Sequence, residues 1–187
     1  MTRDDYTGRL DRLRAEMARA GVGLTAIAPT SNMRYLLGFS PLADERLCLL
    51  LITQEGARLI VPELNAEQME ARTGVTGIAW KDDQGDDQGP GEALQQALDA
   101  LGGIGQALLA ADGAMRADAL LPLQEAASPD RITTASHLVG SLRARKSAEE
   151  IEALARAAAQ ADRAMMIGIE RCGPGVKERD VGESIAR

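Results

Sequence analysis

Residues 47–61 form the sequence Leu-Cys-Leu-Leu-Leu-Ile-Thr-Gln-Glu-Gly-Ala-Arg-Leu-Ile-Val. The first part, residues 47–53, is apolar at positions that would face both sides of a sheet, which predicts a central strand covered on both faces. Gln54-Glu55-Gly56 is a turn signal, and residues 57–61 are predicted to return as the antiparallel partner of that strand. We therefore expect at least one antiparallel pair in the sheet.

Helical and strand patterns alternate on both sides of this hairpin. Before it, we predict a helix over residues 6–20, a strand over 24–28 and a short helix over 33–37, which Ser31 and Asn32 can cap. After it, the pattern predicts helices at 65–72, 94–101 and 116–127, the last broken near Pro122, and strands at 76–80, 106–111 and 131–134. This alternation predicts an α/β fold, a three-layer mixed β-sheet flanked by helices.

The character of the chain changes after Ser136. Ser147 and Glu150 have the spacing of a capping box, which predicts a helix over residues 148–171. Gly173-Pro174-Gly175 would end that helix, and a further helical pattern continues to residue 187. We therefore expect an α/β domain at 1–140, followed at 141–187 by a linker and the opening helices of a second, truncated domain.

The composition of the chain argues against nucleic-acid binding. The 187 residues carry 28 acidic and 21 basic side chains, a formal net charge of −7, and only 2% aromatic residues. The aromatic residues are Tyr6, Tyr35, Phe39 and Trp80. An acidic chain with so few rings that can stack on bases is a poor partner for nucleic acid.

The chain also lacks the signals of a membrane or secreted protein. Its longest strongly apolar run, residues 47–52, is far shorter than the roughly 20 residues of a membrane-spanning helix. The first residues are charged, and Cys48 and Cys172 are too few and too far apart for a disulfide framework. We expect a cytoplasmic protein that binds neither membrane nor nucleic acid.

The spacing of the acidic, histidine and basic side chains does not by itself form a catalytic or metal-binding pattern. The aspartates of residues 82–87 lack the alternation of a calcium loop and are interpreted as a solvated turn. His137 is the only histidine, and its neighbours indicate a surface or junction residue. We expect Arg143, Arg145 and Lys146 to pair with acidic side chains at the domain junction.

Three segments resemble the creatinase/prolidase/Xaa-Pro aminopeptidase family, the pita-bread metallohydrolases that carry an added N-terminal domain. Residues 32–39, Asn-Met-Arg-Tyr-Leu-Leu-Gly-Phe, are similar to the family's Asn-x-x-Tyr-Leu-Thr-Gly-Phe stretch. Residues 142–151, Leu-Arg-Ala-Arg-Lys-Ser-Ala-Glu-Glu-Ile, resemble the Leu-Arg-x-Ile-Lys-Ser-x-x-Glu-Ile junction before the catalytic domain. Residues 172–178 resemble the Pro-Gly-x-Thr-Glu turn after the first helix of that domain. The order and spacing of all three segments agree.

The chain departs from the family pattern at three positions. Leu37 stands where the family usually has Thr or Ser, and we expect this change to alter a polar contact near the substrate mouth that the resemblance implies. Arg145 replaces an aliphatic residue, and Lys177 replaces the Thr that would cap the next helix. We interpret these two changes as structural.

The resemblance implies a hydrolase in which two divalent metal ions (Mn, Co or Zn) activate water against an amide or related C–N bond. The implied ligands are two aspartates, one histidine and two glutamates, all well past the Pro-Gly turn, in the catalytic domain. No histidine follows His137. We therefore expect no catalytic residue and no metal ligand in this chain, and no hydrolysis by it alone.

The resemblance also implies a homodimer in which the N-terminal domain takes part in selecting a peptide or small amide substrate. By motif match, Tyr35, Phe39 and Arg46 lie near the substrate mouth. From the residues alone, the two rings fit a core around a capped turn equally well, and Arg46 beside Glu45 fits a surface ion pair.

Two functions therefore remain open. The first is the N-terminal portion of a metal-dependent Xaa-Pro peptidase-like hydrolase, with a creatinase-like amidinohydrolase or another enzyme of the same fold as variants. The second is a non-catalytic recognition or dimerisation module.

Overall fold

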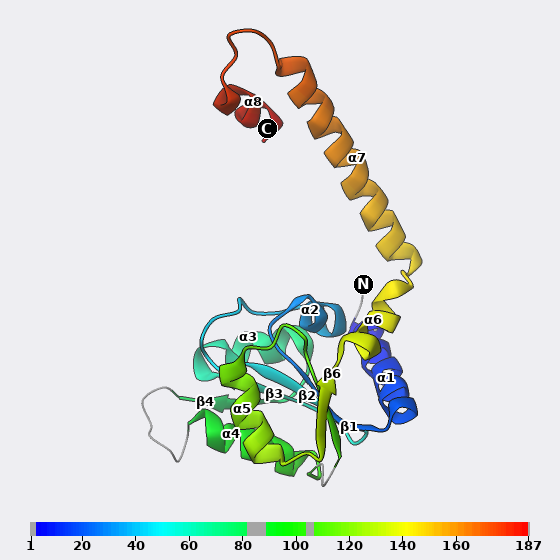
Figure 1. The fold of residues 1–187 in the computed structure, drawn as a ribbon, viewed down its shortest axis with the longest axis vertical. Coiled ribbons are helices and arrows are strands. Elements are labelled where there is room, and N and C mark those ends of the chain that lie inside the picture. Colours follow the sequence, from blue (N-terminus) through cyan, green and yellow to red (C-terminus); the bar gives the residue numbers. More distant parts are fainter. Residues whose placement is uncertain (1–2, 82–88, 104–106, 187) are drawn as a thin grey trace. The chain divides into compact units, whose positions relative to one another are not determined.

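The computed structural model describes residues 3–81, 89–103 and 107–186, so the acidic stretch at 82–87 lies outside the described residues. The chain forms two compact units, Met1–Ala144 and Arg145–Arg187 (Figure 1). The first unit contains a β-sheet and the second contains two helices.

A six-stranded sheet of order β4-β3-β2-β1-β5-β6 forms the middle layer of the first unit. The strands are β1 (Val22–Ile27), β2 (Leu49–Ile52), β3 (Ala57–Pro62), β4 (Gly77–Trp80), β5 (Leu108–Ala111) and β6 (Arg131–Thr134). β2 is antiparallel to β1 and β3, and the other neighbouring pairs are parallel. The carboxyl ends of β1, β3, β4, β5 and β6 therefore lie along one edge of the sheet, which we call the carboxyl edge.

Helices cover both faces of this sheet. They are α1 (Arg3–Ala20), α2 (Ser31–Leu37), α3 (Glu63–Thr73), α4 (Pro90–Ala100), α5 (Ala117–Ala127) and α6 (Ser136–Ala144). Apolar residues of α1, α2, α3 and α6 share one buried cluster, and those of α4 and α5 share the other (Figure 1). This arrangement confirms the predicted three-layer α/β fold.

The central hairpin supplies side chains to both clusters. Leu50 and Ile52 belong to the first cluster, while Leu49 and Leu51 belong to the second, and all four are fully buried. Burying each such side chain stabilises the fold by about 1.5–3 kcal/mol. The turn closes through the amide of Thr53, which donates to the carbonyl of Gly56 at 3.0 Å. The predicted central strand and its hairpin partner are confirmed.

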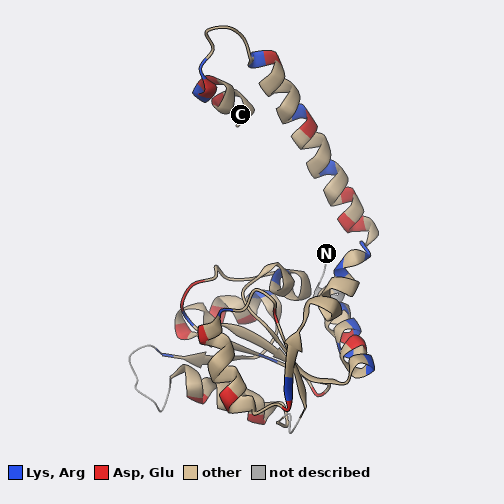
Figure 2. Cartoon of the chain, in the orientation of Figure 1, with Lys and Arg blue, Asp and Glu red and all other residues tan. Residues whose placement is uncertain are grey.

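The second unit consists of α7 (Ala148–Arg171) and α8 (Glu178–Ile185). The predicted capping box is present, because the Ser147 amide donates to Glu150 Oε2 at 2.9 Å and the Glu150 amide donates to Ser147 Oγ at 3.3 Å. Acidic residues occupy the first turn of α7 and Arg171 the last (Figure 2), which complements the helix dipole. Lys177 precedes α8 without a side-chain cap.

Most of the apolar side chains of α7 are exposed. The large exposed ones on this helix are Ile151, Leu154, Met165, Met166, Ile167 and Ile169. Gly168 is the one buried residue of α7, where a Cβ atom would come within 2.9 Å of Ile185. Among the described helices, none is both long enough and apolar enough to cross a membrane.

Candidate functional site

A buried carboxylate lies at the carboxyl edge, directly after β5. Asp112 is only 5% exposed. It accepts hydrogen bonds from Thr30 Oγ1 at 2.7 Å, from Asn32 Nδ2 at 3.3 Å to each oxygen, and from the amide of Ala114 at 3.1 Å. A carboxylate is stable at such a depth only when donors surround it. These bonds join the segment after β5 to the start of α2.

The short helix α2 carries the Asn-x-x-Tyr stretch. Thr30 is its N-cap, because Thr30 Oγ1 accepts the amide of Asn32 at 3.1 Å. The expected cap at Ser31 and Asn32 is therefore wrong by one residue. The side chain of Asn32 instead forms hydrogen bonds with Asp112 and Arg143. Gly38 ends the helix with a left-handed φ of 77°.

Tyr35 lies half-buried between α1 and α6. The guanidinium carbon of Arg9 lies 4.0 Å from the centroid of its ring, and Arg9 Nη1 also donates to the carbonyl of Tyr35. The hydroxyl of Tyr35 donates to the carbonyl of Leu142 at 3.2 Å. The tyrosine hydroxyl therefore ties α2 to the last turn of α6.

Phe39 and Arg46 lie on the segment 38–48, which joins α2 to β2. The guanidinium carbon of Arg72, on α3, lies 4.5 Å from the centroid of the half-buried Phe39 ring. The Arg46 amide donates to Asp44 Oδ1 at 3.0 Å. Tyr35 and Phe39 both pack against the first apolar cluster, whereas Arg46 comes later in the segment, shortly before β2 in the sequence. The end of the segment is fixed by Trp80, whose indole N–H donates to the carbonyl of Leu47 at 2.8 Å.

Arg143 does not have the partner that the sequence suggests. Its Nη1 donates to Asn32 Oδ1 at 2.6 Å and to Ser31 Oγ at 3.1 Å, which are neutral oxygens and not acidic side chains. The prediction of an acidic partner is therefore wrong for this arginine. The amide of Asn32 lies between Asp112 and Arg143.

Sequence patterns gave no indication of two contributors to this edge, Asp112 and Arg9. The only available signal for Asp112 was its position at the end of an apolar strand. Arg9 lies on the first helix, far along the chain from the ring that it covers, so no local pattern points to it.

The thiol of Cys48, at the end of the segment 38–48, is unsuited to nucleophilic chemistry. Burial, followed by the negative charge of Asp44, raises the pKa of Cys48 to about 12. Because the thiolate is the reactive form, Cys48 is unreactive at neutral pH.

The residues described do not fit the metal pair that the family resemblance implies. His137, on α6, is exposed. Within 3–81, 89–103 and 107–186, no three His, Cys, Asp or Glu side chains form a group that could hold a metal ion.

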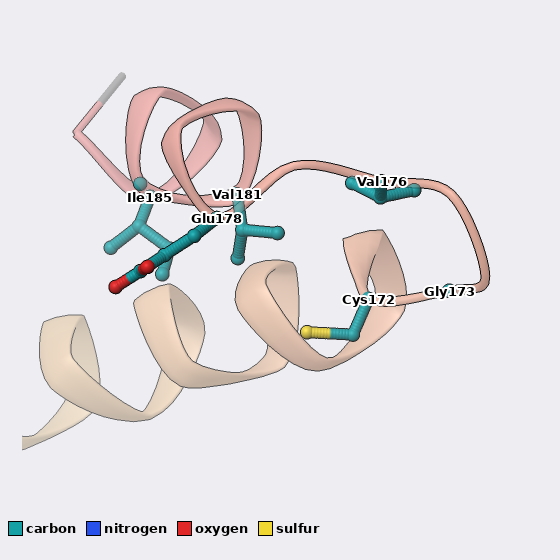
Figure 3. A pocket seen from close by; sticks show the side chains of 7 residues that line it. Cys172, Gly173, Val176, Glu178, Val181 and Ile185 are labelled. Carbon is teal, nitrogen blue, oxygen red and sulfur yellow. The ribbon is translucent and has the colours of Figure 1, made fainter.

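A hollow of about 510 Å³ lies in the second unit, between the end of α7 and α8 (Figure 3). Its lining includes Cys172, Val176, Val181 and Ile185, with Glu178 as its charged member. Two valines, an isoleucine and one thiol offer an apolar surface and no acid–base pair.

The first unit is a three-layer α/β domain, and the buried carboxylate of Asp112 lies at the carboxyl edge of its sheet. Residues 9–145 match the family model described as the creatinase/prolidase N-terminal domain. The chain belongs to this family, as its three motif segments indicate.

Similar proteins extend this match beyond residue 145. The chain is 27% identical to the Xaa-Pro dipeptidase of Pyrococcus horikoshii over 90% of its own length and 44% of that protein. It is 33% identical to the probable dipeptidase PepE of Mycobacterium bovis, over 97% of the chain and 47% of that protein. The crystal structure of dipeptidase PepE from Mycobacterium ulcerans superimposes with a TM-score of 0.81 and 28% identity, covering 100% of this chain and 50% of that one. The chain therefore spans about half the length of the curated relatives it matches.

Proposed function

We propose that this chain is the N-terminal portion of a metal-dependent, Xaa-Pro dipeptidase-like hydrolase. The observation that carries the proposal is the similarity of nearly the whole chain to one half of proteins named as dipeptidases. Its first 140 residues are the accessory α/β domain, and residues 141–187 begin the catalytic domain. The full-length protein is cytoplasmic and binds two Mn, Co or Zn ions in that domain, outside these residues.

In this proposal, the segment around Tyr35, Phe39 and Arg46 borders the substrate mouth for a peptide or small amide. Arg9 and Arg72 hold the two rings in place, so the rings give the segment a fixed shape. Arg46 is only partly buried, and Leu42 on the same segment is 92% exposed. We expect Arg46 to contact the substrate, while Tyr35 and Phe39 shape the segment that carries it.

The proposal also includes a homodimer in which each N-terminal domain contributes to the active site of its partner. Light scattering of the full-length protein tests this part, and a strictly monomeric species would contradict it.

The activity is tested on the full-length protein with Xaa-Pro dipeptides and with Mn, Co or Zn. Arg46→Ala is expected to raise KM at least about fivefold with a smaller change in kcat, since it removes a contact to the bound substrate. Arg12→Ala, an exposed arginine of α1, is the matched control and should leave both constants unchanged.

Two results of these assays would contradict parts of the proposal. If no Xaa-Pro dipeptide is hydrolysed with any of the three metals, the dipeptidase assignment is wrong. Hydrolysis of creatine would then favour the creatinase-like enzyme. The absence of any hydrolysis would favour the non-catalytic module. If Arg46→Ala changes nothing, the activity stands and the position of the substrate mouth is wrong.

A further inference from the structure

We propose that Asp112 and Asn32 are positioning residues that hold Arg143 and, with it, the last turn of α6. We call the side chains of Asp112, Asn32 and Arg143 the relay. The relay connects the Asn-x-x-Tyr stretch to the Leu-Arg segment that ends the first unit. This inference stands independently of the proposed hydrolase activity.

Asp112 is the fixed end of the relay. Its buried carboxylate accepts from the Thr30 hydroxyl, the Asn32 amide and the backbone of Ala114, and its own backbone amide donates to Ala26 at 2.8 Å. The last contact attaches Asp112 to the end of β1, in the middle of the sheet. The carboxylate therefore offers a rigid acceptor at the carboxyl edge.

Asn32 has the chemistry that the middle position needs. An ionised carboxylate only accepts hydrogen bonds, and a guanidinium only donates them. A side chain between the two must present a donor to one and an acceptor to the other, and the amide of Asn32 does so with Nδ2 toward Asp112 and Oδ1 toward Arg143. Aspartate lacks the donor, and leucine lacks both groups.

Arg143 is the exposed end that the relay restrains. It lies in the last turn of α6, and the carbonyls of a last turn generally accept no hydrogen bond within the helix. The hydroxyl of Tyr35 satisfies one of them, at Leu142. Two adjacent residues of this turn, Leu142 and Arg143, are thus attached to α2, and we infer that these bonds prevent the end of α6 from fraying.

A set of variants of the whole 187-residue chain tests the relay through its melting temperature and through amide hydrogen exchange. Asn32→Leu removes both bonds and should lower the melting temperature by about 4 °C or more at every pH. Asn32→Asp removes the donor to Asp112 and places a second carboxylate beside it. It should therefore also lower the melting temperature at neutral pH.

The exchanged pair Asn32→Asp with Asp112→Asn is the decisive variant. It again places a donor opposite an acceptor, and the carboxylate introduced at position 32 then faces Arg143 directly. At least about half of the loss seen in Asn32→Asp at neutral pH should therefore be recovered. A pure packing role of Asn32 predicts no such recovery, and its absence would overturn the proposal.

Arg143→Met provides a variant that does not endanger folding, because Arg143 is exposed. We expect amide exchange over residues 141–144 to accelerate about tenfold, while exchange in the central strands stays unchanged. Arg145→Ala, which replaces an exposed arginine two residues further on, is the matched control. Equal exchange rates in Arg143→Met and Arg145→Ala would contradict a role of the relay in holding this turn.

Discussion

Gly38 meets two separate requirements at the end of α2. Its φ of 77° lies in the left-handed region, which costs about 1–2 kcal/mol for a residue with a side chain. In addition, a Cβ atom at this position would overlap the ring of Tyr6. The ring of Tyr6 therefore occupies the space that any side chain at position 38 would need.

We predict that Gly38→Ala lowers the free energy of unfolding by more than the backbone conformation alone explains. Overlap with the Tyr6 ring adds about 1–3 kcal/mol to the backbone term. Gly21→Ala is the control, because Gly21 has a similar φ of 66° but has no atom within 4 Å of its Cβ position. Chemical denaturation of both variants measures the difference, and equal losses would show that Tyr6 does not restrict this position.

The two cysteines are predicted to differ sharply in reactivity. Cys172 is exposed, whereas Cys48 is buried with its pKa raised from 9.0 to about 12. A thiol reagent at about pH 8 should modify one cysteine in the folded protein and both after denaturation. Cys172→Ser should then abolish labelling of the folded chain, and rapid labelling of Cys48 would contradict its burial.

The raised pKa of Cys48 also determines how this thiol affects the stability of the fold as the pH rises. Between 9.0 and about 12, the unfolded chain loses the thiol proton that the folded chain keeps. The contribution of Cys48 to stability is therefore complete below pH 9.0 and is lost as the pH rises toward about 12.

The long-range contacts of single residues could not be predicted from the sequence. The scarcity of aromatic residues drew attention to Tyr35 and Phe39, but the arginines beside their rings come from α1 and α3. Nothing local marks Arg9 or Arg72 for these positions. The relay could not be predicted either, because Asn32 and Arg143 are 111 residues apart in the sequence.

Strands and helices were more predictable than contacts, because each depends on a local pattern. The hairpin at 47–61 was clear from its buried apolar run and its turn. The predicted break in the helix at Pro122 is wrong, since α5 continues from Ala117 to Ala127. Proline removes one hydrogen bond, but the burial of Leu123 and Ala127 in the second cluster stabilises the helix across this position.

The helix α6 was not predicted at all. Its nine residues are few for a periodic pattern, and its buried members, Leu138 and Val139, are adjacent. The tertiary contacts of this helix, including those to Tyr35 and Asn32, are long-range and do not appear in the local sequence.

We predict that Ser147→Ala weakens the first turn of α7. The loss of an N-cap hydroxyl costs about 1 kcal/mol, which corresponds to roughly fivefold faster amide exchange over residues 148–152. Glu150→Gln is the control, because glutamine serves at the same position of a capping box. Faster exchange in Glu150→Gln than in Ser147→Ala would show that the box does not hold this turn.

The two compact units differ in how their helices are stabilised. Both buried apolar clusters lie within Met1–Ala144. In Arg145–Arg187, Gly168 is the one buried residue of α7, and α8 has none. Helices outside a tertiary core are marginally stable in water, so the two units should respond differently to heat.

We predict that the fragment 1–144 unfolds within about 3 °C of the whole chain when the sheet is monitored. The whole chain should also lose part of its helical circular dichroism at a lower temperature, as α7 melts. A fragment that fails to fold, or a single transition in which all helix and sheet signals coincide, would contradict this division of stability.

The bond from Trp80 to the carbonyl of Leu47 has a practical consequence. Trp80 is the only tryptophan, it is 5% exposed, and its indole is attached to the end of the segment that carries Phe39 and Arg46. Its intrinsic fluorescence is therefore a label-free optical reporter of that segment. A ligand that displaces residues 38–48 should shift the emission to longer wavelength, before any assay of turnover has been developed.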